Sequence, residues 1–75
     1  MINSAQIAGK ILGINFLTKT HNELLLQLKT LNGPVNVIIS DIQTIEAAKD
    51  FRLGDEITVT GRLGGGSTVH AVEVT

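Results

Sequence analysis

The side chains best suited to chemistry in this 75-residue chain do not form a catalytic constellation. Histidine occurs only at His21 and His70, and neither lies near a patterned carboxylate or a serine in a G-x-S-x-G turn. Asp55 and Glu56 are adjacent carboxylates, but they directly follow a predicted helix end, where a solvated turn is the simpler explanation. Cysteine is absent, and the other potential ligands lack the clustered spacing of a metal site. We therefore expect a protein that is not an enzyme and needs no cofactor or metal.

A glycine-rich stretch at residues 61–68, with the sequence GRLGGGST, invites comparison with a phosphate-binding loop. The lysine that should precede the Ser/Thr is absent, and strand-forming residues follow the stretch. No helix N-terminus would therefore receive a phosphate. We interpret the stretch as the flexible tip of a β-hairpin.

Basic and polar side chains, by contrast, are placed to follow a nucleic-acid backbone. The net charge is only −1, yet residues 1–40 carry three lysines and one acid, whereas residues 41–56 carry five acids and two basic residues. We expect a mildly basic surface whose ammonium and guanidinium groups can track phosphates. An alternative, equally open from the residues, is that these groups only keep a small sheet soluble. The candidate contacts are Lys10, Phe16, Lys19, His21, Gln27, Lys29, Asn36 and Arg62.

Phe16 has a separate role among these candidates, because aromatic rings stack on the bases of single strands. Tyrosine and tryptophan are absent, and phenylalanine occurs only at Phe16 and Phe51. Phe51 falls in the predicted helix. Phe16 is therefore the one side chain expected to stack, and the core must be built from isoleucine, leucine and valine.

Two of these candidates, Lys10 and Phe16, lie on a long strand predicted at residues 5–17. Apolar positions recur there at every second residue, with Ile7 and Ile11 on one face, which is the period of a half-buried strand. Gly9 and Gly13 interrupt the strand, and glycines at such positions commonly mark bulges or sharp bends. We expect the strand to bend there and to pair with two neighbours.

Two further strands follow the polar turn at residues 18–22. Residues 23–31 place leucines on one face at every second position from Leu24 to Leu28. Leucine also suits helices, but this alternation favours a strand. The sequence NGP that follows is a hairpin signal, and its proline can only open the next strand. Residues 35–39 form that third strand.

A single helix is expected after the third strand. Ser40 is the predicted N-cap, with Gln43 completing a capping box. An apolar stripe at i, i+3 and i+6 begins at Ile42 and is extended by Leu53 at the helix exit. Gly54 ends the helix, because it can adopt a left-handed conformation.

The last two strands are predicted at residues 56–63 and 68–74. The whole order is three strands, one short helix and two strands, in a single domain spanning residues 1–75. This all-β order, with a glycine-bent first strand, is that of the five-stranded oligonucleotide/oligosaccharide-binding (OB) barrel. On such a barrel the ligand lies across the outer face of the first three strands.

Several aliphatic side chains fall on the predicted outer faces. A monomer of this size should not leave so much aliphatic surface in water. We therefore expect a homo-oligomer; the alternative is a register slipped by one residue, which would exchange the two faces. The residues concerned are Leu12, Leu25, Leu31 and Ile38.

Four segments resemble the bacterial single-stranded DNA-binding proteins and the related primosomal replication protein B. The predicted helix and its exit resemble those of the family, and the strand after the helix resembles the family's Val-x-Val-x-Gly-Arg-Leu strand. The matching segments are the MIN start with AGKI at residues 8–11, IEAAKDFRLGD at 45–55, ITVTGRL at 57–63 and VHAVEV at 69–74.

The resemblance implies binding of single-stranded DNA, with RNA as a possible ligand, by a homodimer or homotetramer. Lys10 and Arg62 match basic positions of the family, whereas its stacking tryptophans and acidic tail have no counterpart here. The alternative is a structural or protein-interaction barrel that does not bind nucleic acid. No apolar run approaches the roughly 20 residues of a membrane span, and no signal peptide is evident, so a cytoplasmic protein is expected.

Overall fold

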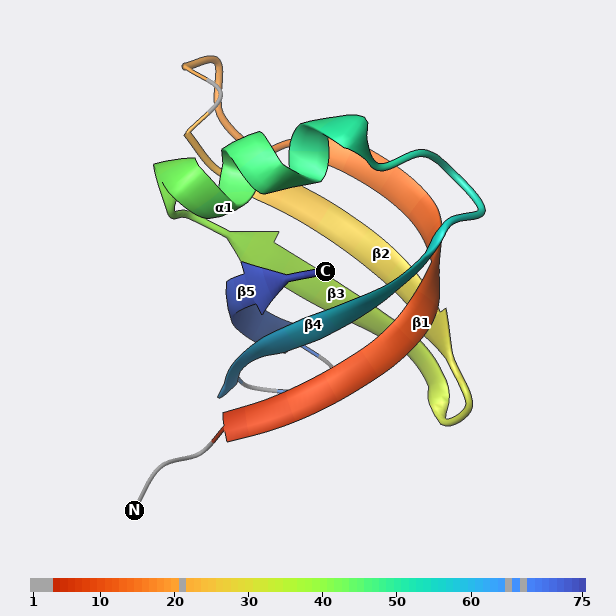
Figure 1. The fold of residues 1–75 in the computed structure, drawn as a ribbon. Helices are drawn as coiled ribbons and strands as arrows, with labels where there is room; N and C mark the ends of the chain where they lie inside the picture. The colour runs from red at the N-terminus through yellow and green to blue at the C-terminus, as the bar shows by residue number, and fades with distance from the viewer. Residues whose placement is uncertain (1–3, 21, 65, 67) are drawn as a thin grey trace.

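A computed structural model describes residues 4–20, 22–64, 66 and 68–75. Five strands and one short helix follow one another in the predicted order (Figure 1). The elements are β1 (Ser4–Phe16), β2 (Leu24–Thr30), β3 (Gly33–Ile39), α1 (Ile42–Ala47), the 3₁₀ turn η1 (Ala48–Asp50), β4 (Glu56–Leu63) and β5 (Thr68–Val74).

The strands close into a barrel in the order β1-β2-β3-β5-β4. Closure depends on β1, which pairs with β4 through residues 4–10 and with β2 through residues 10–16. The pairing of β1 with β2 shifts register between Ile11 and Gly13, so one extra residue bends the strand. The predicted glycine bend and the double pairing of the first strand are therefore confirmed, as is the five-stranded barrel.

The barrel is filled by aliphatic side chains from every strand and from the helix. Leu26, Leu28, Val37, Ile39 and Val59 are fully buried. The leucines predicted to share a face in β2, from Leu24 to Leu28, are buried, and alternate residues are buried in β3 and β4 as well. The register was therefore not slipped in these three strands, where the outer aliphatic residues Leu25 and Ile38 are half-buried.

The helix differs from its prediction in both its cap and its length. Asp41, not Ser40, is the N-cap: its Oδ2 accepts hydrogen bonds from the Thr44 backbone N–H and the Thr44 Oγ1, both at 2.9 Å. The helix ends at Ala47 and tightens into η1, well before Gly54. Because the helix is short, it can bury only the residues that point directly at the barrel end.

The predicted apolar stripe of the helix is only half correct. Ile45 and Ala48 are buried, but Ile42 and Leu53 keep 71% and 67% of their surface exposed. Thr44 is buried in their place, and its hydroxyl group lies 3.4 Å from the Val72 carbonyl oxygen. None of the described helices is long and apolar enough to cross a membrane.

The turn between η1 and β4 fastens the helix to the middle of β1. The Gly54 N–H donates to the Ile11 carbonyl oxygen at 2.8 Å, and the Ile11 N–H donates to the Asp55 carbonyl oxygen at 2.9 Å. Gly54 has φ of +91°, which side chains disfavour. Glycine is thus required at the predicted position, although it shapes a turn rather than ending α1.

Candidate nucleic-acid interface

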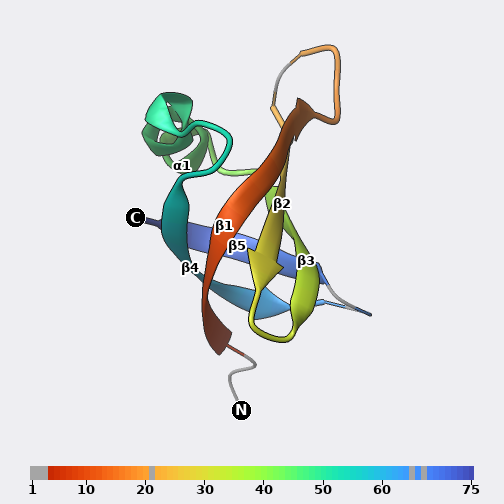
Figure 2. The ribbon, with the colours of Figure 1, turned by 90° about the vertical axis from the view of Figure 1, so that its right-hand side faces the viewer.

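The outer face of β1, β2 and β3 carries four of the eight predicted contacts. Figure 2 shows these three strands side by side, with α1 at one end of the barrel. Since Leu26 and Leu28 point into the core, the residues between and beside them on β2 point outward. Side chains that are paired across neighbouring strands share a face, so the pairing places the predicted residues in rows.

One row contains the two central lysines. Lys10 of β1 lies directly opposite Lys29 of β2, and Glu56 of β4 lies on the other side of Lys10. All three side chains are exposed. The only ion pair between described residues joins Lys49 and Glu46 at 2.8 Å, on the helix. Both lysines of the row can therefore accept an anionic ligand without breaking an ion pair within the described part of the chain.

The adjacent row is built from amides. Gln27 of β2 lies opposite Asn36 of β3, and on its other side lies Gly13 of β1. The Gln27 Oε1 atom is 2.7 Å from the point where a methyl group on Gly13 would stand. The Gln27 side chain therefore lies across the bare backbone of β1. Four predicted contacts, Lys10, Lys29, Gln27 and Asn36, thus form one continuous surface.

Arg62 is separated from that surface. It pairs with His70 of β5, and His70 pairs with Ile38 of β3. On one side, Arg62 of β4 is therefore separated from β3 by the exposed His70. On the other side, Arg62 pairs with Ser4 of β1, six residues along the strand from Lys10. His70 was not among the predicted contacts, and only its cross-strand position beside Arg62 draws attention to it.

The loop between β1 and β2 holds Lys19 near the helix end of the barrel. The Thr18 Oγ1 donates to Asn22 Oδ1 at 2.7 Å, and the Leu17 N–H donates to the Glu23 carbonyl oxygen at 2.8 Å. Lys19 is exposed within this closed loop. The predicted contact His21 lies outside the described residues.

Phe16 lies away from the lysine and amide rows. It pairs with the inward-facing Leu24, because the bulge after Ile11 shifts every later residue of β1 by one position. Its side chain lines a hollow of about 170 Å³ under the helix that Ile45 and Phe51 also line, and it remains 45% exposed. The structure therefore brings both phenylalanines together at the helix end.

One titratable group near this end has a clearly shifted pKa. The hydrogen bonds from the Thr44 backbone N–H, and then from its hydroxyl, hold the pKa of Asp41 below its ordinary value, because they stabilise the carboxylate. This carboxylate serves the helix cap. No cluster of three or more potential metal ligands occurs among the residues that the structure describes.

Several solved structures share this architecture. The chain superposes on a chain of the S. pombe Stn1–Ten1 complex with a TM-score of 0.83 and 17% identity, over 99% of its own length. The mitochondrial single-stranded DNA-binding protein of S. cerevisiae gives 0.81 and 13%, covering 100% of this chain and 93% of that one. A small single-stranded DNA-binding protein from Streptomyces coelicolor gives 0.74 and 15%, over 96% and 88%.

The chain has the OB fold. At these identities the likeness shows the fold alone. The chain spans 57% of the Stn1–Ten1 chain. It spans 17% of a chain of TiaS, a tRNAIle2 agmatidine synthetase, which it matches with a TM-score of 0.79 and 18% identity over 95% of its own length. No family model matches the sequence. No curated protein matches it either.

Proposed function

We propose that the outer face of β1, β2 and β3 binds single-stranded nucleic acid, DNA or RNA, with little sequence preference. The observation that carries this proposal is the pairing of Lys10 with Lys29, with Gln27 and Asn36 in the next row. Two ammonium groups on neighbouring strands suit the closely spaced phosphates of one strand. The neighbouring amides can donate and accept hydrogen bonds, so they suit any base edge.

The comparisons support this proposal through the names of two neighbours. The proteins from S. cerevisiae and Streptomyces coelicolor are named for single-stranded DNA binding, and this chain covers most of the length of each. The shared fold of these two proteins and this chain supports the proposal. Because no aromatic ring lies in the lysine and amide rows, we expect binding here to depend mainly on charge.

A titration of fluorescein-labelled oligo-dT tests the proposal. We expect fluorescence anisotropy to rise with protein concentration at low salt, and affinity to fall as salt increases. Two phosphate contacts predict a slope of roughly −1.4 in log K against log[salt] for a single strand. Lys49→Ala is the matched control, because Lys49 lies on η1 and is paired with Glu46. Absence of binding at low salt would refute the proposal.

We also propose that the protein self-associates. Of the four aliphatic residues on the predicted outer faces, Leu12 is 54% exposed and Leu31 is fully exposed, whereas Leu25 and Ile38 are half-buried. Aliphatic surface of this kind is commonly covered by another chain. Sedimentation analysis at high micromolar concentration tests this, and a monomeric mass under those conditions would contradict it.

A further inference from the structure

The barrel is not closed along the whole of β1. In the described part of the chain, β1 pairs with β2 only from Lys10 onward, whereas residues 4–10 pair with β4. A methyl group on Gly9 would lie 2.8 Å from the Lys29 carbonyl oxygen, so the two strands meet closely at Gly9. Between Ser4 and Ala8, the edge of β1 that faces away from β4 has no strand partner among the described residues.

The direction of the backbone groups on this edge follows from the pairing. Both the N–H and the carbonyl oxygen of Ile11 bond to residues 54 and 55, on the β4 side. In a regular antiparallel strand, successive residues turn these groups to opposite edges, and the pairing with β4 shows no register shift. Gln6 and Ala8 therefore turn their N–H and carbonyl groups toward the unpaired edge.

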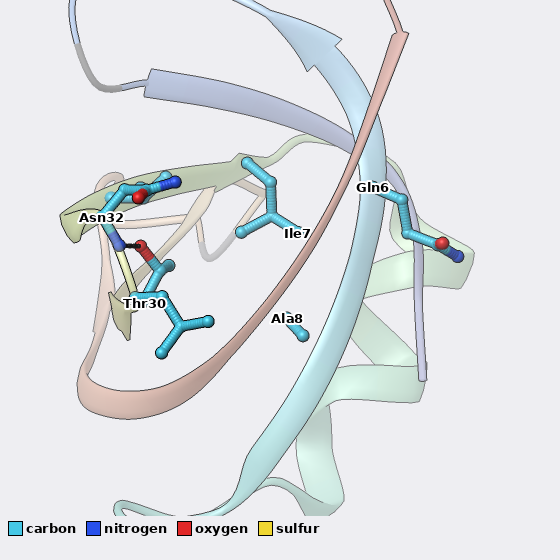
Figure 3. A pocket seen from close by; sticks show the side chains of 7 residues that line it. Gln6, Ile7, Ala8, Thr30 and Asn32 are labelled. Carbon is cyan, nitrogen blue, oxygen red and sulfur yellow. Dashed lines mark hydrogen bonds between the residues drawn. The ribbon is translucent and has the colours of Figure 1, made fainter.

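A hollow of about 320 Å³ lies beside this edge, between β1 and the turn that joins β2 to β3 (Figure 3). Ile7 and Val35 line it, and both pack against the core. Leu31 also lines it and is fully exposed at the turn. The edge thus combines unpaired backbone groups with an apolar recess for a side chain.

The charge beside the edge identifies what an added strand should carry. Ala8 and Leu31 also line a second hollow, of about 260 Å³, together with Lys10 and Glu56. Lys10 pairs with Lys29 of β2 at the edge of β1 that is open between Ser4 and Ala8. Glu56 pairs with Lys10 at the opposite edge of β1, which β4 covers. An acidic side chain on an added strand would therefore approach two ammonium groups first.

We propose that this edge of β1 binds an extended peptide segment of another protein by strand addition. The segment carries an aliphatic side chain for the Ile7 and Val35 recess, and an acidic side chain on its opposite face for Lys10 and Lys29. Exposed strand edges accept extended chains in this way: backbone hydrogen bonds provide affinity, and alternate side chains provide specificity. Because Lys29 already pairs with Lys10, the acidic side chain stands opposite Ala8, which shares the outer face with Lys10. The aliphatic side chain stands opposite Ile7, so the two side chains are neighbours in the peptide.

The peptide also has a consequence for nucleic-acid binding. It uses Lys10 and Lys29, which are the proposed phosphate contacts. Peptide and nucleic acid should therefore compete. This competition rests on the proposed function, whereas strand addition does not.

A labelled hexapeptide of alternating valine and aspartate is the probe. We expect it to bind the full chain, and to slow the hydrogen exchange of the Gln6 and Ala8 backbone amides, measured by ¹⁵N NMR. The same peptide with N-methylated backbone amides, and a hexapeptide of alternating valine and lysine, should bind at least about tenfold more weakly.

Ala8→Pro tests the edge from the protein side. Proline removes an N–H that points away from β4, so the β4 pairing is retained while the edge is blocked. We expect peptide affinity to fall by about tenfold or more. Ala8→Val retains the N–H and is the matched control. If Ala8→Pro does not fold, Lys10→Glu with Lys29→Glu should reverse the preference between the aspartate and lysine peptides.

Three results would overturn the proposal. The first is no binding of the aspartate peptide at millimolar concentration. The second is binding without protection of the Gln6 and Ala8 amides. The third is protection of these amides that rises with protein concentration alone, because a second copy of the chain would then occupy the edge. None of these outcomes depends on whether oligo-dT binds, so the failure of either proposal can be recognised separately.

Discussion

Lys10 of β1 and Lys29 of β2 are direct cross-strand neighbours on the outer face of the barrel, with an acidic residue beside only one of them. Like charges opposite each other in a sheet destabilise it. The adjacent lysines therefore lower the stability of the free protein and favour binding of an anionic ligand. We expect Lys29→Ala to raise the free energy of unfolding by roughly 0.2–1 kcal/mol, and Lys10→Ala to raise it less, because Lys10 also pairs with Glu56.

The same two substitutions should weaken binding. Each should lower the affinity for oligo-dT and reduce the magnitude of the salt slope by about 0.7, the contribution of one phosphate contact. Denaturant titration and anisotropy on the same preparations measure both effects. Lys49→Ala should leave the salt slope unchanged. Weaker binding together with lower stability would instead indicate that the lysines support the fold.

Regular alternation made most of the barrel predictable. The structure gives β4 as Glu56–Leu63 and β5 as Thr68–Val74, which are the predicted bounds. Gly54 precedes β4, and three consecutive glycines at residues 64–66 separate β4 from β5, so the strand ends beside these glycines are clear in the sequence. The helix was less predictable because Ser40 and Asp41 are both good caps. Asp41 is the cap because the backbone N–H and the hydroxyl group of Thr44 both donate to its carboxylate.

The site was predictable only in part. Alternation alone shows that Lys10 and Lys29 face outward, but their pairing depends on the tertiary register of β1 and β2. The bulge between Ile11 and Gly13 changes the predicted site more, because it decides the face on which Phe16 lies. Without it, Phe16 would share a face with Lys10; with it, Phe16 shares a face with the buried Leu24. A single extra residue is not visible as a change in hydropathy.

Gly61 should be the glycine least tolerant of a side chain. It is buried at the irregular pairing of β4 with β5, and a methyl group there would meet the carbonyl oxygen of His70 and lie 2.9 Å from the Ala71 Cα atom. These are backbone atoms that cannot rotate away. We expect Gly61→Ala to lower the free energy of unfolding by roughly 1–3 kcal/mol or more.

Gly13→Ala is the matched comparison for Gly61→Ala. The methyl group at Gly13 would meet the end of the flexible Gln27 side chain, which can move. We expect a smaller loss of stability in denaturant titrations. Equal losses for the two variants would show that backbone contact at Gly61 is not the cause.

Phe16 provides a test of stacking. It is the predicted stacking residue, it is 45% exposed, and it lies at the end of β1 beside the loop that carries Lys19. Because Phe16 lies away from the lysine and amide rows, we expect Phe16→Leu to leave the affinity for oligo-dT nearly unchanged. A loss of roughly 1–3 kcal/mol of binding free energy, the contribution of one stacked base, would instead show that the bound strand extends to the helix end. Leu17→Ala, at the neighbouring exposed position, is the control. Lower stability with unchanged affinity would assign Phe16 to packing under the helix.

Asp41 should make the stability of the protein depend on pH at the acid end. Its pKa is lower in the folded chain than in the unfolded chain, chiefly because the Thr44 backbone N–H and hydroxyl stabilise the carboxylate. A depressed pKa contributes stability that is fully present above the unfolded pKa, near 3.8, and is lost as the pH falls through the folded value.

We expect Asp41→Ala to lower the denaturation midpoint at pH 7, because the helix loses its cap. Asp41→Asn keeps a capping oxygen without the charge, so its midpoint should lie between those of the wild type and Asp41→Ala at pH 7. Below the folded pKa, the wild type and Asp41→Asn should converge. Urea titrations between pH 2.5 and pH 7 measure this. A constant gap between these two proteins across that range would show that the charge of Asp41 does not stabilise the cap.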